Sequence, residues 1–236
     1  MNCYGALASF YDRLTEDVAY SSFADQYETA FRENGGQFHL LLDLCCGTGS
    51  LTAEMALRGY ELIGVDASEE MLVKAREKCR DLPASPLFVL QRVEELDLYG
   101  TVDAAYCSLE GINYLSPVSC SRMLQRLKFF IRPGGLFLFD IRSADFLKTL
   151  DGSTFVDEDA DLLCLWRADF DEDLHAIIYG MDIFTRQDQM WRRDREEHIE
   201  YIHTFQQLKK ALEESGFSLV SFMEQDDREH YIAMKK

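Results

Sequence analysis

A short glycine-rich segment and two aspartates are the residues of this 236-residue sequence best suited to bind a ligand. The apolar run at 39–44 contains Asp43 and leads directly to Gly47 and Gly49, before a stretch of helical character. Glycines at such a turn let a ligand approach the backbone closely, and the start of the helix offers free N–H groups. Asp66 ends a second apolar run 23 residues after Asp43, where a carboxylate suits the hydroxyls of a ribose. The pattern predicts a nucleoside-containing cofactor at the carboxyl ends of parallel strands.

The spacing of the glycines argues against a nicotinamide cofactor. The dinucleotide fingerprint G-x-G-x-x-G has a third glycine three residues after the second. Here that position is Thr52. A G-x-G pair alone is a weak signal, so a nicotinamide-dependent oxidoreductase stays open as the less favoured alternative.

A second group of polar residues follows the fourth and fifth predicted strands, at the edge where substrates bind in such sheets. Glu110 is the best-placed base, and Asn113 and Arg142 complete the candidate catalytic residues. Each also has an ordinary structural interpretation, because asparagine favours turns and Arg142 can pair with Asp140 or Asp145. The histidines are dispersed and no Cys/His group has zinc spacing, so we predict no metal site.

The composition excludes several classes of partner. Lys and Arg number 24 against 42 Asp and Glu, which gives a formal net charge of -18. Such a chain repels phosphate backbones and anionic membranes, so we expect neither nucleic acid nor membrane as a partner. Residues 1–6 lack the pattern of a secretory signal, and no stretch approaches the length of a membrane span. With seven scattered cysteines, a reduced, cytoplasmic protein is the expected setting.

Strands and helices alternate through the first 150 residues. We predict two helices within 3–34 and a further helix from Ser116-Pro117 to Ile131. The predicted strands are 39–44, 61–66, 86–90, 102–107 and 136–140. This alternation is typical of a doubly wound parallel sheet.

The rhythm changes after residue 150. Residues 162–170, 174–184 and 190–202 are predicted as long strands of an antiparallel insertion. Thr204 and Gln207 then form a capping box for a helix that ends at Gly216, and two strands, 217–223 and 229–234, close the chain.

These elements predict an α/β fold: a Rossmann-like, doubly wound, seven-stranded, mostly parallel sheet with an antiparallel β lid inserted after strand 5. We predict one domain with four parts. They are a helical cap at 1–36, a cofactor-binding core at 37–150, the lid at 151–203, and the last helix and two strands at 204–236.

The predicted lid carries features that suit a small acceptor. Candidates for an aromatic wall are Trp166, Tyr179, Trp191 and Tyr201, although for any single one of them the favoured role is to join the lid to the core. Eight carboxylates lie between residues 157 and 173, with Arg167 alone to oppose them. This excess favours a cationic acceptor such as an amine, the ordinary alternative being a solvated rim.

Several segments resemble the class I S-adenosylmethionine-dependent methyltransferases. Residues 42–49 (LDLCCGTG) resemble the family's first motif, and residues 64–72 (GVDASEEML) its acidic loop. Residues 127–141 resemble the segment around its fifth strand. Residues 4–20 and 111–115 (GINYL) resemble a bacterial branch that methylates small molecules. The resemblance spans roughly the whole chain and implies S-adenosylmethionine as the cofactor.

The resemblance implies a cofactor site of twelve residues: Tyr11, Tyr20, Asp43, Cys45, Gly47, Gly49, Asp66, Ala67, Met71, Val93, Glu94 and Cys107. Asp43 and the Cys45 carbonyl would face the methionyl ammonium, and Asp66 would hold the ribose hydroxyls. Gly47 and Gly49 would give the cofactor room.

The rest of this set would surround the adenine and the methionine end. Met71 would pack on the adenine, residues 91–94 would pass its edge, and Tyr11 and Tyr20 would close over the methionine end. One departure concerns Arg92, because the family has an acidic residue at this place and arginine accepts no hydrogen bond. The resemblance therefore leaves open whether Gln91, Glu94 or the backbone binds the adenine amino group, or whether the alignment with the family is shifted by one residue.

Taken together, the residues and the resemblance predict methyl transfer to a nitrogen or oxygen of a small molecule. Proximity and alignment supply most of the rate, because the methyl donor is already activated. Residues 107–110 (CSLE) replace the Asn-Pro-Pro-Tyr signature of enzymes that methylate nucleobase amines or planar amides. A non-catalytic partner protein that binds S-adenosylmethionine is the other alternative, and the sequence specifies neither the acceptor nor the oligomeric state.

Overall fold

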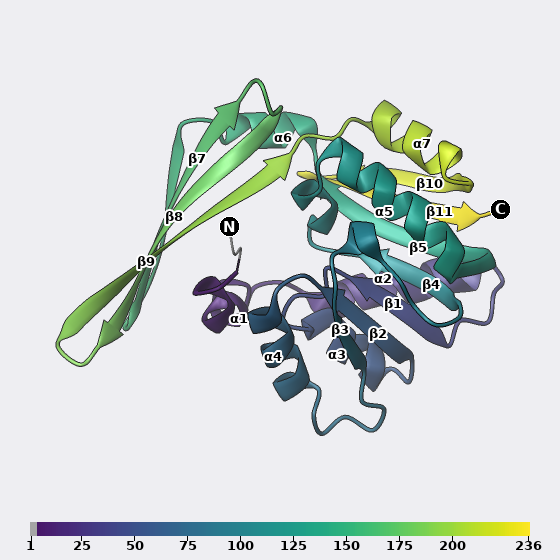
Figure 1. The fold of residues 1–236 in the computed structure, drawn as a ribbon, viewed down its shortest axis with the longest axis horizontal. Helices are drawn as coiled ribbons and strands as arrows, with labels where there is room; N and C mark the ends of the chain where they lie inside the picture. The colour runs from purple at the N-terminus through teal and green to yellow at the C-terminus, as the bar shows by residue number, and fades with distance from the viewer. Residues whose placement is uncertain (1–3) are drawn as a thin grey trace.

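A seven-stranded sheet runs through the middle of the protein, which the computed structural model describes over residues 4–236 (Figure 1). The strand order is β10-β11-β5-β4-β1-β2-β3. Strands β1 to β5 are parallel, whereas β11 is antiparallel to both β5 and β10. The strands are β1 (Leu40–Leu44), β2 (Glu61–Asp66), β3 (Leu87–Leu90), β4 (Val102–Cys107), β5 (Ile131–Arg142), β10 (Phe217–Gln225) and β11 (Arg228–Lys235).

The strand order places a ligand crevice between β1 and β4. From β1 the chain adds β2 and β3 on one side, and it then returns to the other side of β1 to add β4 and β5. At such a reversal the loops from the carboxyl ends of neighbouring strands diverge and leave a crevice.

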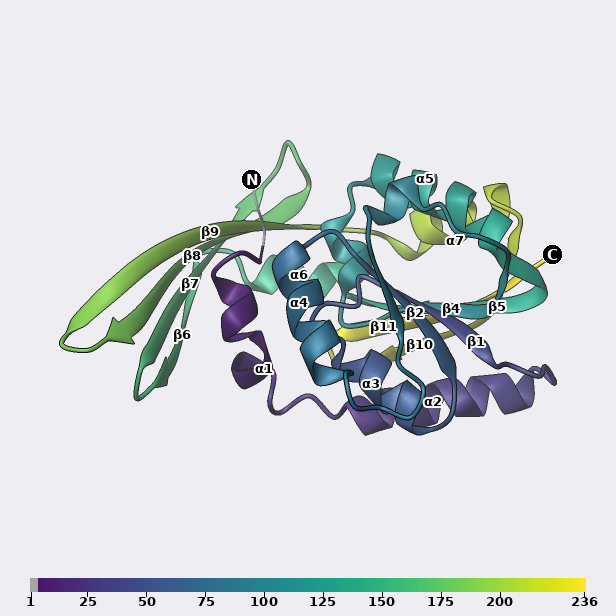
Figure 2. The ribbon, with the colours of Figure 1, turned by 60° about the horizontal axis from the view of Figure 1, so that its bottom comes forward.

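Helices cover both faces of the sheet (Figures 1 and 2). One face carries α5 and α7, and the other carries α2 and α3, with α4 beside β3. Alternation along the strands explains this, since Leu41 packs in the cluster with α2 and α3 while Leu42 packs in the cluster with α5. The helices are α1 (Tyr11–Leu14), α2 (Tyr20–Glu33), α3 (Ser50–Leu57), α4 (Glu69–Lys78), α5 (Pro117–Phe130), α6 (Ala144–Thr149) and α7 (Phe205–Glu214).

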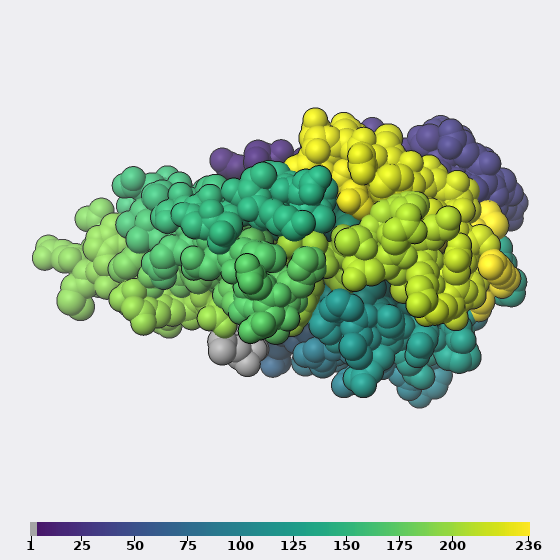
Figure 3. Space-filling model, turned by 90° about the horizontal axis from the view of Figure 1, so that it is seen from above, coloured from purple at the N-terminus to yellow at the C-terminus, as the bar shows by residue number. Residues whose placement is uncertain are grey.

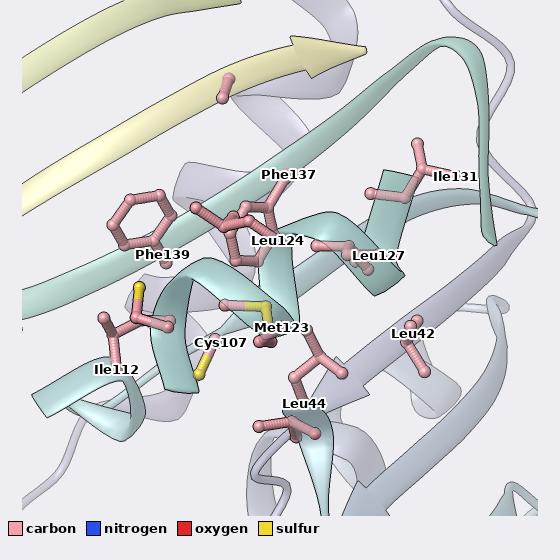
Figure 4. Packing of buried hydrophobic residues seen from close by; sticks show 14 of the residues in the cluster. Leu42, Leu44, Cys107, Ile112, Met123, Leu124, Leu127, Ile131, Phe137 and Phe139 are labelled. Atoms are coloured by element: carbon pink, nitrogen blue, oxygen red, sulfur yellow. The ribbon is translucent and has the colours of Figure 1, made fainter. Parts of the chain in front are cut away.

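The core under α5 is the larger of the two main clusters. Figure 4 shows Met123, Leu124 and Leu127 of this helix lying over Leu42 of β1 and Phe137 of β5. All five side chains are almost fully buried. Burial of a side chain of this size contributes about 1.5–3 kcal/mol, so this layer fixes the strand ends that carry the site.

A second, four-stranded antiparallel sheet forms the lid. Its order is β6-β7-β8-β9, with β6 (Ser153–Asp159), β7 (Leu162–Asp171), β8 (Ala176–Gln187) and β9 (Met190–Tyr201). It leaves the core after α6 and returns before α7, and it extends from the body of the protein as a lobe (Figures 1 and 3).

The structure confirms the predicted fold class, with a seven-stranded mostly parallel sheet and an antiparallel sheet inserted after β5. The capping box of Thr204 and Gln207 is also present. The prediction missed β6, because this edge strand is mostly exposed and three of its seven residues are acidic.

Two other boundaries differ from the prediction. Before α2 the described chain forms only a 3-10 turn at Leu7–Ser9 and the short α1, and residue 3 of the predicted helix lies outside the described residues. Strand β5 begins at Ile131, and its pairing with β4 then moves directly to Leu136. The residues between them bulge out of the ladder, and Gly135 is required there because a Cβ would lie 2.4 Å from the Asp103 carbonyl oxygen. None of the helices in residues 4–236 has the length and apolar character needed to cross a membrane.

Candidate active site

The turn between β1 and α3 has a left-handed backbone at three positions. The φ angle is 56° at Cys45, 55° at Gly47 and 73° at Gly49. Gly49 is also required for space, because a Cβ there would lie 2.9 Å from the Cβ of Ala75 on α4. The turn therefore packs tightly on α4, and its residues 45–48 line a cavity.

Two backbone N–H groups hold the Asp66 carboxylate at the end of β2. Gly47 N–H donates to Oδ2 at 2.8 Å, and Ser68 N–H donates to Oδ1 at 2.9 Å. Burial raises the pKa of Asp66, and these bonds oppose the rise. Each oxygen keeps a lone pair for a further donor, so the glycine turn both fixes Asp66 and leaves it able to bind.

Asp43, within β1, is buried and receives a hydrogen bond from the Thr52 hydroxyl of α3. Thr52 is the residue found where a dinucleotide-binding turn has its third glycine. Burial raises the pKa of Asp43 to about 7, although the hydroxyls of Thr52 and Tyr106 favour the ionised form. A cation bound beside Asp43 would stabilise its charge.

These groups line a first cavity of about 330 Å³ at the carboxyl ends of the strands. Ten of the twelve predicted cofactor residues line it: Tyr11, Tyr20, Asp43, Cys45, Gly47, Asp66, Ala67, Met71, Val93 and Glu94. Gly49 and Cys107, the other two predicted residues, are not among the residues that line it. Gly49 is used for packing on α4, while the Cys107 side chain is buried, with its Sγ where a Cβ of Gly111 would fall.

The segment after β3 places a carboxylate beside the first cavity although residue 92 is an arginine. The Arg92 side chain turns back on Glu94, and its Nε lies 2.8 Å from Glu94 Oε1. The Glu94 side chain is 9% exposed and the Arg92 side chain is 62% exposed. A carboxylate thus lines the cavity two residues after Arg92, and the guanidinium covers it from the solvent side.

A second cavity, also about 330 Å³, lies between the core and the lid. The lid residues that line it are Phe155, Asp157, Trp166, Tyr179, His198 and Glu200. The strand register explains why, since it pairs Phe155 with Trp166 and Tyr179 with His198, and alternation puts every second residue on the same face. All six therefore point from one face of the lid sheet, called the inner face below.

The two cavities share a wall. Tyr4, Tyr11, Leu109 and Tyr114 line both of them. The rings of Tyr4 and Tyr11 meet edge to face with centroids 5.8 Å apart, and Tyr114 lies 5.8 Å from Tyr4. The two cavities therefore adjoin at these four residues.

Comparison with known proteins agrees with this geometry. Residues 41–135 match the methyltransferase domain family. YqeM of Bacillus subtilis, named as a methyltransferase, is 30% identical over 222 residues, which cover 92% of this chain and 87% of YqeM. The chain belongs to the class I S-adenosylmethionine-dependent methyltransferases.

Solved structures extend this likeness over the whole methyltransferase. An S-adenosylmethionine-dependent methyltransferase from Clostridium acetobutylicum has a TM-score of 0.88 and 26% identity, with 99% of each chain covered. The sugar N-methyltransferase KedS8 from Streptoalloteichus has a TM-score of 0.82 at 20% identity, covering 96% of this chain and 92% of that one. The second likeness shows a shared fold that includes the lid.

In this methyltransferase a strained loop forms part of the shared wall. Leu109 and Glu110, directly after β4, have φ angles of 54° and 53°. Asp140 of β5 holds them, accepting the N–H of Leu109 at 2.9 Å and that of Glu110 at 3.2 Å. Arg228 of β11 binds both Asp140 and the Glu110 side chain. Each of these strained backbone conformations costs about 1–3 kcal/mol, and the buried ion pair stabilises the loop against that cost.

The three predicted catalytic residues have different surroundings. Glu110 and Arg142 line the second cavity, and their closest atoms lie 3.5 Å apart. Arg142 also pairs with Asp227 at 3.1 Å, whereas the alternative interpretation of this residue named Asp140 or Asp145 as its partner. Asn113 is fully buried away from both cavities.

Asn113 has a structural role instead. Its side-chain amide donates to the carbonyl of Tyr201 at 3.0 Å and accepts the N–H of Arg142 at 2.9 Å. It joins the loop after β4 to the end of β9 and to β5. These bonds agree with the interpretation of Asn113 as a loop-fixing residue, and Asn113 is not among the residues that line either cavity.

The N-terminal segment is tied to the lid by Glu196 of β9. Its carboxylate accepts the N–H groups of Tyr4, Ala6 and Leu7 at 2.9, 2.6 and 3.0 Å. Nε2 of His198 lies 2.9 Å from the same group. Burial alone would raise the pKa of Glu196, but these bonds lower it. The lid thereby positions the tyrosines of the shared wall.

Of the four predicted lid aromatics, Trp166 and Tyr179 line the second cavity. Trp191 is 49% exposed and lies near the far turn of the lid. No local pattern singles out Glu200, because β9 is polar along most of its length. The only signal is its spacing of two residues from His198, which puts both on the inner face.

Proposed function

We propose that this methyltransferase transfers a methyl group to a nitrogen or oxygen atom of a small molecule bound in the second cavity. The observation that carries this proposal is the pair of adjoining cavities that share the wall of Tyr4, Tyr11, Leu109 and Tyr114. One cavity has the residues expected to hold S-adenosylmethionine, and the other has free polar and aromatic groups. In-line transfer needs the acceptor atom about 3–3.5 Å from the methyl carbon, so donor and acceptor would have to meet where the two cavities adjoin.

The residues of the first cavity fit S-adenosylmethionine. Asp66, with two lone pairs available, would accept the ribose hydroxyls. Asp43 is a buried carboxylate that needs a cation, and with the Cys45 carbonyl it would hold the methionyl ammonium. Tyr11 and Tyr20 would cover this end of the cofactor.

The adenine would lie between Met71 and Val93, both of which are buried apolar residues of the cavity wall. Glu94 would accept the hydrogen bond from the adenine amino group, which Arg92 is unable to do. Arg92 would then act by holding Glu94 in place. The carboxylate that binds the adenine would then lie two residues after the position at which the family has it, which would account for the arginine at position 92.

The bound cofactor supplies a methyl group on a positively charged sulfur, which needs no further activation. The chain has to exclude water, align the acceptor, and accept a proton when the acceptor carries one. Tyr4, Tyr11 and Tyr114 would exclude water from the line of transfer. A small acceptor is supported by the volume of the second cavity and by the fold shared with the sugar N-methyltransferase KedS8.

Calorimetric titration with S-adenosylmethionine, S-adenosylhomocysteine and NADH tests the first half of the proposal. We expect micromolar binding of both sulfur ligands, no binding of NADH, and at least a tenfold loss of affinity in Asp66→Ala. Asp81→Ala, which removes an exposed carboxylate in the turn after α4, is the matched control. Thermal melting of each variant shows whether the fold is intact. Binding that is unchanged in Asp66→Ala would contradict the assigned site.

The second half of the proposal, methyl transfer to a small molecule, is tested by turnover of small-molecule acceptors, with release of S-adenosylhomocysteine as the readout. Substitution of Tyr114 by alanine opens the shared wall and should lower turnover at least tenfold while cofactor affinity stays within about threefold. A protein that binds S-adenosylmethionine and methylates only macromolecules would refute the small-molecule assignment.

A further inference from the structure

Glu200 of β9 is a buried carboxylate with an unpaired oxygen. It lines the second cavity and is 5% exposed, and its Oε2 has no hydrogen-bond partner within residues 4–236. The indole N–H of Trp166, on the same inner face of the lid, is also buried and unpaired in this part of the chain. Leaving such an atom unpaired costs about 1–3 kcal/mol. Both atoms are therefore placed to bind polar groups of a molecule in this cavity.

The charged groups that face Glu200 come from several elements. Glu110 lies in the loop after β4, Arg142 on β5 and Arg228 on β11. The hydroxyl of Tyr179, diagonally across on β8, favours the ionised form of Glu200. The net charge around Glu200 depends on whether Arg142 and Arg228 are already paired with other carboxylates.

Both arginines are already paired. Arg142 lies 3.1 Å from Asp227 and 3.5 Å from Glu110, and Arg228 binds Glu110 and Asp140. Three carboxylates thus face two guanidinium groups before any lid carboxylate is counted. The cavity is acidic as a whole, so an anionic acceptor would be repelled and a cationic one attracted.

Aromatic rings complete this environment. The second cavity is lined by the rings of Tyr4, Tyr11, Tyr114, Phe155, Trp166 and Tyr179. Aromatic faces attract ammonium groups, by about 0.5–2 kcal/mol each. A carboxylate at the back of an aromatic cavity is an arrangement suited to an ammonium ion that gains methyl groups.

We propose that the methyl acceptor is an amine, which binds as its ammonium form with an N–H directed at Glu200, and that Glu200 removes the proton before transfer. This inference rests on the proposed function and adds the class of acceptor. The Glu200 carboxylate takes one proton from the ammonium, which leaves a neutral amine with a free lone pair. The nitrogen then forms a bond to the methyl carbon as the carbon–sulfur bond breaks, and that electron pair stays on sulfur. The product is a methylated ammonium ion and neutral S-adenosylhomocysteine, and the proton on Glu200 passes to water.

The acidity of Glu200 suits this role. Burial first, and then the charge of Glu110, raise the pKa of Glu200 to about 8, while Arg142 and Arg228 oppose the rise. A base is most effective when its pKa is near the working pH. An ordinary exposed glutamate would be too weak a base to deprotonate an ammonium group at this pH.

Turnover of paired probes tests the proposal. The probes are benzylamine with benzyl alcohol, cyclohexylamine with cyclohexanol, and glucosamine with glucose, each with saturating S-adenosylmethionine. We expect methylation of at least one amine and of none of the alcohols. Methylation of an alcohol in preference to its paired amine would overturn the proposal, and so would the absence of any amine turnover by protein that binds S-adenosylmethionine. A protein that does not bind S-adenosylmethionine would instead refute the proposed function.

Glu200→Gln, which keeps the shape of the side chain, should lower kcat/KM for the amine about 100-fold at pH 7 with unchanged cofactor affinity. This loss of kcat/KM should shrink as the pH approaches the pKa of the free amine, because the unprotonated amine then binds directly. Glu158→Gln, at an exposed carboxylate of β6 that lines neither cavity, is the matched control and should stay within about threefold. Equal losses in the two variants would overturn a specific role for Glu200, as would a loss in Glu200→Gln that is independent of pH.

A measurement on the wild-type protein alone covers the case in which Glu200→Gln fails to fold. Benzylamine is titrated calorimetrically into the complex with S-adenosylhomocysteine at pH 7.5, in two buffers of different ionisation enthalpy. Binding of an ammonium ion beside protonated Glu200 should release a proton, so the observed heat should depend on the buffer. Binding without proton release, or no binding, would overturn the proposal.

Discussion

Replacing Asp140 with asparagine tests whether one buried carboxylate holds the loop between the two cavities. Asp140 accepts the N–H groups of Leu109 and Glu110 and binds Arg228. An amide has a single acceptor oxygen, and its NH₂ group would face an N–H or a guanidinium, donor against donor. At least one of these contacts is therefore lost in Asp140→Asn.

The magnitude follows from burial. The Asp140 side chain is 1% exposed, so water is unable to replace the lost contacts. Removing one partner of a buried ion pair costs about 3–5 kcal/mol. At about 2–4 °C per kcal/mol for a domain of this size, Tm should fall by roughly 6–20 °C. The strained backbone at Leu109 and Glu110 would then relax, so methyl transfer should fall more than cofactor affinity.

Asp103 offers a matched control at the opposite end of the sheet. It accepts the N–H groups of His39 and Leu40 and pairs with Arg132, but its side chain is 23% exposed. We expect Asp103→Asn to cost about 1 kcal/mol or less, as for exposed ion pairs, with no effect on methyl transfer. Thermal melting of the two variants measures the loss of stability, and steady-state kinetics measures the loss of methyl transfer. Similar losses of Tm in both would refute the argument from burial, and unchanged turnover in Asp140→Asn would refute a role in the wall.

Three further predictions concern the cofactor site and its support. The pKa of Asp43 is raised to about 7, and a cationic ligand needs the ionised form of this carboxyl group. The affinity for S-adenosylmethionine, measured by calorimetry, should therefore fall about tenfold per pH unit below pH 7. Asp43→Asn should bind the cofactor weakly, and its affinity should show no such dependence on pH. Glu196→Gln should speed hydrogen exchange at the N-terminal amides it binds at least tenfold, as read by mass spectrometry, whereas unchanged exchange would contradict the tie to the lid. Gly49→Ala should lower Tm more than Gly59→Ala, because both have positive φ but only the first would place a Cβ against Ala75; equal losses would show that the close contact is unimportant.

The parts of the fold that the sequence predicted well depend on local patterns. Strand and helix periods, the glycine turn and the capping box at Thr204 each involve residues a few positions apart. Edge strand β6 was missed because it packs little apolar surface, so its pairing partner and not its own sequence makes it a strand. The cofactor cavity was predictable for the same reason, since eight of the ten predicted residues that line it lie in short motifs at or after the ends of β1, β2 and β3.

The acceptor side was predicted poorly because long-range pairs build it. Glu110 meets Arg228 across 118 positions, and Asn113 meets Tyr201 across 88. Nothing near Arg228 in the sequence signals this pair. The same holds for Asp140, which lies at the end of a buried strand and was expected only as a partner for Arg142.

The alternation of the lid strands places the proposed acceptor site and an ion-pair network on opposite faces of the lid. Glu200 and the other cavity-lining residues of the lid lie on the inner face, whereas the outer face carries Asp182. Asp182 accepts from Arg167, Arg193 and Arg195, and these ion pairs lower its pKa against the effect of burial. If the acceptor binds there as proposed, we expect substitutions at Glu200 to alter which acceptor fits, whereas substitutions at Asp182 should loosen the sheet without altering the acceptor. Such a division explains how one cofactor-binding core supports acceptors that the core sequence does not specify.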